Sequence, residues 1–137
     1  MRATYVDSSA IVKLAVGEAE SGALRRHLQQ RRPLISSALA RTEVLRALLP
    51  SGPTALIRGR QVLATMDLVR VNEQILNAAG ALPPADLRSL DAIHLATARQ
   101  LGRDVNQLVT YDERMADAAR GTGFNVATPR PAGRLSW

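Results

Sequence analysis

Short apolar runs alternate along the chain with longer segments whose apolar residues recur at helical spacing. The short runs predict strands at residues 3–6, 34–35, 67–71, 108–111 and 124–127. The longer segments predict helices from Ser8 or Ser9 to Ala15, at 18–30, 38–49, 54–66 and 73–81, from a cap at Ser89 through 90–101, and from Asp112 to Gly121 or Gly123.

The regular alternation of strands and helices predicts one α/β domain. Its central sheet is expected to be mostly parallel, with four to five strands covered by helices on both faces. The 137 residues are long enough for one such domain with its own core. Because parallel strands end at a common edge, sites in these folds form there. Asp7 and Asp112 each follow an expected strand, so both belong to that edge.

Composition limits the kinds of core and site. Hydrophobic residues make up 46% of the chain and aromatic residues only 3%, so the core is expected to be aliphatic. The absence of cysteine excludes disulfides and cysteine-ligated zinc. No run approaches the roughly 18 apolar residues of a membrane span, and Asp7 and Lys13 interrupt the first apolar segment, which is therefore no secretory signal. We expect a cytoplasmic protein.

The charge balance favours a polyanionic partner. The net charge is +6, and 17 of the 18 basic residues are arginine, whose planar donors match phosphate oxygens. Two plainer explanations stay open, because arginine also follows from a G+C-rich coding sequence and because basic side chains often only solvate a surface. With so few aromatic residues, contacts to RNA would depend on its backbone and shape rather than on base stacking.

Four acidic residues lie beside apolar segments, where a lone charge is unfavourable. They are Asp7 after the first strand, Glu43 in an apolar helix, Asp91 near core-like residues, and Asp112 after an apolar strand. Gathered together, they would need a shared counter-charge. Oxygen ligands of this kind favour Mg²⁺ or Mn²⁺ over zinc. A metal held there could activate a water for attack on a phosphodiester.

Each acid also has a structural explanation. Asp7 could be a turn residue at a strand end, and Asp112 a helix N-cap. Glu43 could pair with an arginine on its own helix, and Asp91 could interact with the helix dipole. His94, one helical turn after Asp91, is expected to be a packed or hydrogen-bonded structural residue outside the chemistry.

Four segments resemble the signatures of PIN domains, and more closely those of VapC-type toxins of bacterial toxin–antitoxin pairs. They are YVDSSAIVKL, ARTEVLRAL, LDAIHLATA and LVTYDERMADAARGTGFNV, and the resemblance runs in order through residues 4–127. It implies a PIN-like α/β/α fold over 1–128, followed by a Pro/Arg-containing tail at 129–137. It also implies an Mg²⁺- or Mn²⁺-dependent endoribonuclease that forms a homodimer and is inhibited by a DNA-binding VapB-type antitoxin.

By this resemblance the family's catalytic and metal-binding acids fall on Asp7, Glu43, Asp91 and Asp112. The resemblance also implies that the hydroxyl of Thr110 supports the metal site, although a β-branched strand residue is the plainer interpretation.

The residues around the acids suggest further roles. Ser9 could cap a helix, orient Asp7 or bind a metal-bound water. Arg41, Arg88 and Arg114 are candidate substrate-binding residues because they are near the acids in sequence. In the toxin family the helices within 8–30 and 38–66 help to form the dimer and an antitoxin groove, whereas the alternative is that they only build this domain's core.

Two other functions remain open. The first is a non-catalytic PIN-fold module for RNA binding or assembly, against which the full set of four acids argues. The second is a DNA-directed nuclease, because the same metal chemistry suits either backbone.

Overall fold

The structure is a computed structural model that describes residues 2–132; residues 133–137 of the expected tail lie outside the described part. The strands are β1 (Ala3–Val6), β2 (Leu34–Ser37), β3 (Asp67–Val69), β4 (Val105–Val109) and β5 (Val126–Ala127). The helices are α1 (Ser8–Ala15), α2 (Ser21–Gln29), α3 (Ala40–Leu48), α4 (Pro53–Ala64), α5 (Glu73–Gly80), α6 (Ser89–Leu101) and α7 (Glu113–Gly121), with short 3-10 helices at Leu49–Ser51 and Gly102–Asp104.

The five strands form one sheet in the order β3-β2-β1-β4-β5, and every neighbouring pair is parallel. This confirms the predicted α/β class. Strand β1 lies at the centre, between β2 and β4, so its carboxyl end is surrounded by other chain segments. The central position explains why the residue that follows β1 is buried.

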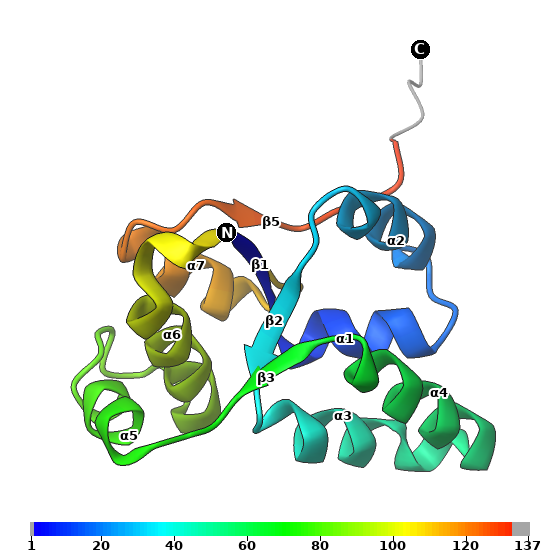
Figure 1. Cartoon of the computed structure of the whole chain (residues 1–137), viewed down its shortest axis with the longest axis horizontal. Helices are drawn as coiled ribbons and strands as arrows, with labels where there is room; N and C mark the ends of the chain where they lie inside the picture. The colour runs from blue at the N-terminus through cyan, green and yellow to red at the C-terminus, as the bar shows by residue number, and fades with distance from the viewer. Residues whose placement is uncertain (1, 133–137) are drawn as a thin grey trace.

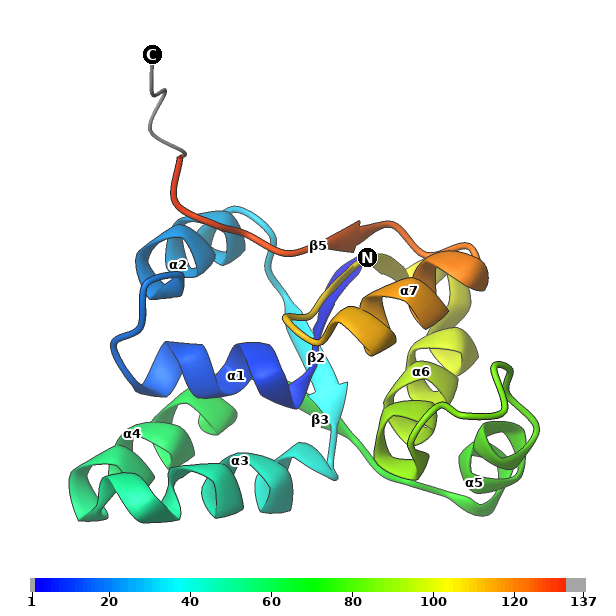
Figure 2. The ribbon, with the colours of Figure 1, turned by 180° about the vertical axis from the view of Figure 1, so that it is seen from behind.

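Helices cover both faces of the sheet, which gives three layers (Figure 1). Helices α1 to α4 pack on one face and α5 to α7 on the other, as the reverse view also shows (Figure 2). Successive residues of β1 point to opposite layers: Tyr5 packs with Leu95 and Leu108, whereas Val6 packs with Ile11. Within residues 2–132, no helix combines the length and apolar character needed to cross a membrane.

Several predicted boundaries differ from the structure. Strand β2 continues to Ser37, whereas β3 ends at Val69, β5 begins at Val126 and α3 begins at Ala40. Strand β4 begins at Val105 and ends at Val109, so Thr110 lies beyond it. The pairing of Val105 with Ala3 extends the strand through Asn106 and Gln107, whose polarity hides it in the sequence. Helix α2 begins at Ser21 rather than 18.

The expected helix caps also differ. The cap of α1 is Asp7, not Ser8 or Ser9, because the Asp7 carboxylate accepts from the backbone N–H of Ala10. At α6 the cap position belongs to Arg88 rather than Ser89. Both corrections move a cap to a residue of the predicted site.

Candidate functional site at the carboxyl ends of the strands

Asp7 is the most enclosed of the four predicted acids, with 4% of its surface exposed. Its Oδ1 accepts from the Ser9 hydroxyl at 2.6 Å and from the Ala10 backbone N–H at 3.2 Å. Its Oδ2 accepts from the Thr110 hydroxyl at 2.5 Å. Both carboxylate oxygens are therefore fixed in direction.

The adjacent strands β1 and β4 bring these groups together. The backbone N–H of Asp7 donates to the Val109 carbonyl at 3.1 Å, which joins the two strand ends. The Ser9 hydroxyl in turn accepts from the backbone N–H of Tyr111 at 2.9 Å. Burial raises the pKa of Asp7, and the hydrogen bonds from Ser9 and Thr110 counter only part of that effect. The carboxylate is thus rigidly placed but short of positive charge.

Glu43 reaches the same region from α3. Its Oε1 accepts from the Ser8 hydroxyl at 2.7 Å and contacts Nε2 of His94 at 2.6 Å. Burial acts to raise the pKa of Glu43, but the hydrogen bonds to His94 and Ser8 outweigh it, and the pKa lies below its ordinary value. This carboxylate is therefore held in its ionised form.

His94 is buried on α6 and links Glu43 to β1. Its Nδ1 lies 2.7 Å from the Tyr5 hydroxyl, which burial and the charge of Asp7 keep protonated by raising the pKa of Tyr5 well above its ordinary value. With Tyr5 donating to Nδ1, a neutral imidazole carries its proton on Nε2 and donates it to Glu43. The expectation of a packed, hydrogen-bonded histidine is confirmed, but its partner is a predicted site acid.

Asp91 and Asp112 form the outer side of the region and share one cation. Asp91 lies in the first turn of α6, and Asp112 caps α7 by accepting from the backbone N–H groups of Arg114 and Met115 through Oδ1. The guanidinium of Arg88 donates to Oδ2 of Asp91 through Nε at 3.1 Å and to Oδ2 of Asp112 through Nη2.

The two outer carboxylates influence each other. Burial and the negative charge of Asp112 raise the pKa of Asp91, although Arg88 opposes this effect. The Arg88 side chain is 61% exposed, so solvent weakens its compensation. One guanidinium also serves two carboxylates, so it compensates only part of their negative charge.

The donor set suits a hard divalent cation, because it consists of carboxylate and hydroxyl oxygens. Oε2 of Glu43 and Oδ1 of Asp91 have no hydrogen-bond partner within residues 2–132. As they stand, however, no three carboxylate or imidazole groups in this part of the chain are gathered closely enough to enclose a metal. The chemistry of the residues fits a metal, although their positions in this structure do not enclose one.

The predicted supporting residues take different positions. Ser9 and Thr110 both contact Asp7, and Thr110 also accepts from the backbone N–H of Asp112 at 3.1 Å. Of the three predicted substrate-binding arginines, Arg88 alone contacts a site acid through its side chain among the described residues. Arg41 and Arg114 are exposed on α3 and α7.

The sequence interpretation missed the contacts that Tyr5, Ser8 and His94 make around Glu43. Two local signals point to them in hindsight. Ser8 directly follows Asp7, and His94 lies one helical turn after Asp91, so each shares a helix end or face with a site acid. That Ser8 and His94 meet at Glu43 on α3 depends on tertiary packing.

Comparisons with known proteins identify relatives of this chain. A family model described as PIN domain matches residues 4–121. Ribonuclease VapC46 of Mycobacterium tuberculosis (strain ATCC 25618 / H37Rv) is 59% identical over 129 residues, which cover 94% of this chain and 99% of that protein. Ribonuclease VapC47 of Mycobacterium tuberculosis (strain CDC 1551 / Oshkosh) is 38% identical over 130 residues, covering 91% and 96%.

Two solved structures have a similar fold. Mycobacterium tuberculosis VapC20, described as a sarcin-ricin loop cleaving toxin, gives a TM-score of 0.74 at 21% identity and covers 94% of this chain and 100% of its own. A toxin–antitoxin complex from Klebsiella pneumoniae gives 0.72 at 23% identity, covering 95% and 100%. At these identities the similarity concerns the fold.

Proposed function

The chain belongs to the PIN-domain family as a VapC-type member, and from this premise we propose that it is a metal-dependent endoribonuclease, the toxin of a type II toxin–antitoxin pair. One observation carries the proposal. The four acids, from four separate parts of the chain, lie around the carboxyl ends of β1 and β4, and hydroxyl groups neighbour Asp7 and Glu43. The relatives named ribonuclease supply the reaction class.

Asp7, Glu43, Asp91 and Asp112 would hold Mg²⁺, for which Mn²⁺ could substitute. Such an ion supplies an activated water and stabilises the leaving oxygen of the phosphodiester. Ser9 and Thr110 keep Asp7 aimed at the site, and His94 and Ser8 keep Glu43 ionised. Because Oε2 of Glu43 has no hydrogen-bond partner among the described residues, Glu43 can accept a proton or bind the ion without breaking the hydrogen bonds of its Oε1.

The basic surface suits RNA as the substrate. A net charge of +6 attracts a polyanion, and we propose that Arg41, Arg88 and Arg114 contact the RNA backbone around the acids. Contacts between arginine and phosphate carry no information about the base, so these contacts would orient the strand rather than select its sequence. Such an enzyme would act in the cytoplasm, where its RNA substrates are.

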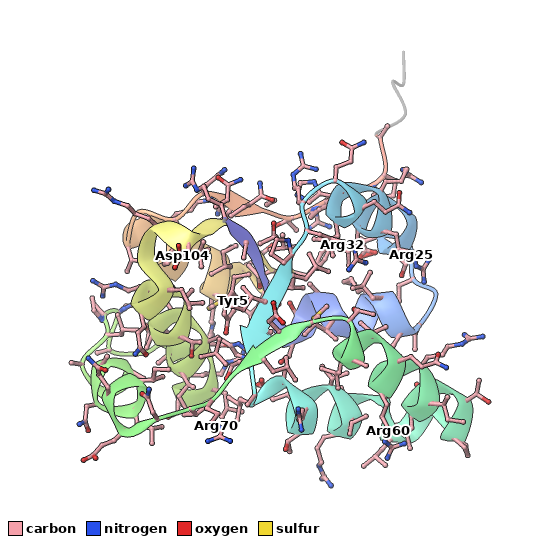
Figure 3. The ribbon with its side chains drawn as sticks, in the orientation of Figure 1. Tyr5, Arg25, Arg32, Arg60, Arg70 and Asp104 are labelled. Carbon is pink, nitrogen blue, oxygen red and sulfur yellow. The ribbon has the colours of Figure 1, made fainter. Side chains whose placement is uncertain are left out.

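A groove at the C-terminal end of α1, away from Asp7, supports the antitoxin proposal. It measures about 640 Å³ and lies between α1, α2, β2 and α4, and its apolar lining includes Leu28, Leu34 and Val62. Arg25 and Arg32 lie along it, and both are labelled in Figure 3. An amphipathic antitoxin segment with acidic residues would match this surface. We also propose that the toxin forms a homodimer.

Cleavage assays on purified protein test the nuclease proposal. We expect cutting of RNA that requires Mg²⁺ or Mn²⁺, stops on adding a chelator, and falls by about three orders of magnitude or more in Asp7→Asn and Asp91→Asn, since each removes a ligand charge. Asp117→Asn is the matched control, because Asp117 is an exposed acid on α7 whose side chain is 82% accessible.

The same assay separates the alternatives. RNA binding without metal-dependent cutting would favour the non-catalytic module, and preferential digestion of single-stranded DNA would favour a DNA-directed nuclease. Cutting that persists in both Asp7→Asn and Asp91→Asn would overturn the assignment of the acids.

A further inference from the structure

Arg88 occupies an unusual position for a surface arginine. It is the N-cap residue of α6 but makes no side-chain cap hydrogen bond. Its guanidinium instead bridges Asp91 and Asp112, which belong to two different helices. The chain's own cation therefore stands between two of the four acids proposed to hold a metal.

We propose that Arg88 is an exchangeable counter-ion: it pairs with Asp91 and Asp112 in the metal-free protein and has to release at least one of them when a divalent cation binds. The proposal rests on the proposed metal site and assigns to Arg88 a regulatory role that adjacency in sequence does not suggest. Its consequence is that Arg88 competes with the metal.

The hydrogen bonds of the Asp91 and Asp112 carboxylate oxygens support competition between Arg88 and a metal ion. Oδ1 of Asp112 is committed to the backbone N–H groups at the start of α7, so Oδ2 is the oxygen left for another cation. Arg88 holds that Oδ2 and also Oδ2 of Asp91. A divalent ion that uses both carboxylates must displace the guanidinium from at least one of them, because two cations at one oxygen repel.

Release of Arg88 is energetically accessible. Its side chain is 61% exposed, whereas those of Asp91 and Asp112 are 16% and 22% exposed. Ion pairs made by an exposed side chain contribute little because solvent screens their charges, so a divalent ion can replace both. The segment before Arg88 is also largely exposed over residues 83–86, which leaves space for the side chain to swing outward. The freed guanidinium would then be beside the acids, where a substrate phosphate would lie.

Metal affinity measured without RNA tests the exchange directly. Calorimetric titration of MnCl2 into parent protein and Arg88→Gln should give a dissociation constant that is roughly fivefold lower in the variant, since no guanidinium has to be displaced. Arg88→Lys keeps the charge but has a single ammonium in place of the two bridging nitrogens, so its dissociation constant should lie between those of the parent and Arg88→Gln. The matched control is Arg99→Gln at the other end of α6, where the arginine is exposed and forms no ion pair within residues 2–132.

Thermal unfolding gives a second readout. Arg88→Gln should lower the melting temperature of the metal-free protein and enlarge the increase that MnCl2 produces. An unchanged or weaker Mn²⁺ affinity in Arg88→Gln, with normal binding in the parent and in Arg99→Gln, would overturn the role of Arg88 alone. A parent that binds no Mn²⁺ would instead overturn the proposed metal site, and this inference with it.

Discussion

Asp7 and Asp112 both follow a parallel strand and both cap the next helix, yet their surroundings differ. Asp7 is buried, and both of its oxygens are held by neutral donors, namely Ser9, Thr110 and the backbone of α1. Asp112 is partly exposed. Its Oδ1 caps α7, and its Oδ2 accepts from the exposed guanidinium of Arg88.

The comparison suggests that the two sides of the site have different roles: the partners of Asp7 orient it, whereas the partner of Asp112 also compensates its charge. Neutral hydroxyls can orient a carboxylate without satisfying its charge, so the Asp7 side of the site stays ready for a cation. The arginine at Asp112 does satisfy charge, and it can be replaced. We therefore expect substitutions around Asp7 to reduce RNA cleavage. Substitutions around Asp112 should instead change the metal affinity or the free energy of unfolding.

Among substitutions that leave the four acids in place, the largest effect is expected from Thr110→Val, which removes a hydroxyl from a buried carboxylate. Loss of such a supporting hydrogen bond typically reduces metal affinity or activity by about 10–100-fold, and we expect the upper end because Oδ2 of Asp7 keeps no other partner in residues 2–132. RNA cleavage rates would measure it. Thr122→Val, at the end of α7, is the control. Equal cleavage rates in the two variants would contradict the role of the Thr110 hydroxyl in supporting Asp7.

His94→Leu should have the next largest effect, about tenfold on cleavage. Loss of its hydrogen bond removes the strongest influence that lowers the pKa of Glu43, so that pKa should rise. The acid limb of the pH–rate profile should then move to higher pH. Tyr5→Phe keeps the imidazole and is the matched control. A lower rate with an unmoved profile would indicate that His94 serves only the fold.

The pH dependence of the free energy of unfolding tests whether the pKa of Asp7 is raised in the folded protein. Its folded-state pKa is raised, so the native protein keeps this proton to higher pH than the unfolded chain does. The resulting stabilisation is present at low pH and is lost as pH rises from about 3.9, the ordinary carboxyl value, through the raised one. In chelator, Asp7→Asn should become progressively more stable relative to the parent across that window, at no more than about 1.4 kcal/mol per pH unit. Urea unfolding at several pH values would measure the difference, and a constant difference would contradict the raised pKa.

The smallest effect concerns the cap role of Asp112. Asp112→Ala should lower the free energy of unfolding by about 1 kcal/mol, whereas Asp112→Asn should retain most of the stability because asparagine also caps helices. Urea unfolding of the two metal-free variants would compare them. Equal losses would show that charge, through Arg88, matters more than the cap.

Several features follow from the sequence because they depend on neighbours along the chain. The alternating apolar runs predict the strands and the α/β class, and the caps and breaks predict most helices within a few residues. The four acids and Ser9 are recognisable because each occurs at a strand end or within a helix of strong local character. The domain boundary at 128 and the catalytic roles stay predictions.

Only the tertiary structure decides which side chains meet. Local pattern reveals neither that Glu43 of α3 faces His94 of α6 nor that Arg88 spans two helices, because these contacts join residues up to 51 positions apart. Sequence periodicity fixes which face of an element is apolar, whereas the order β3-β2-β1-β4-β5 fixes which ends adjoin. The chain itself therefore specifies the acids, and the packing of its layers decides that Asp7 is held by hydroxyls and Asp112 by an arginine.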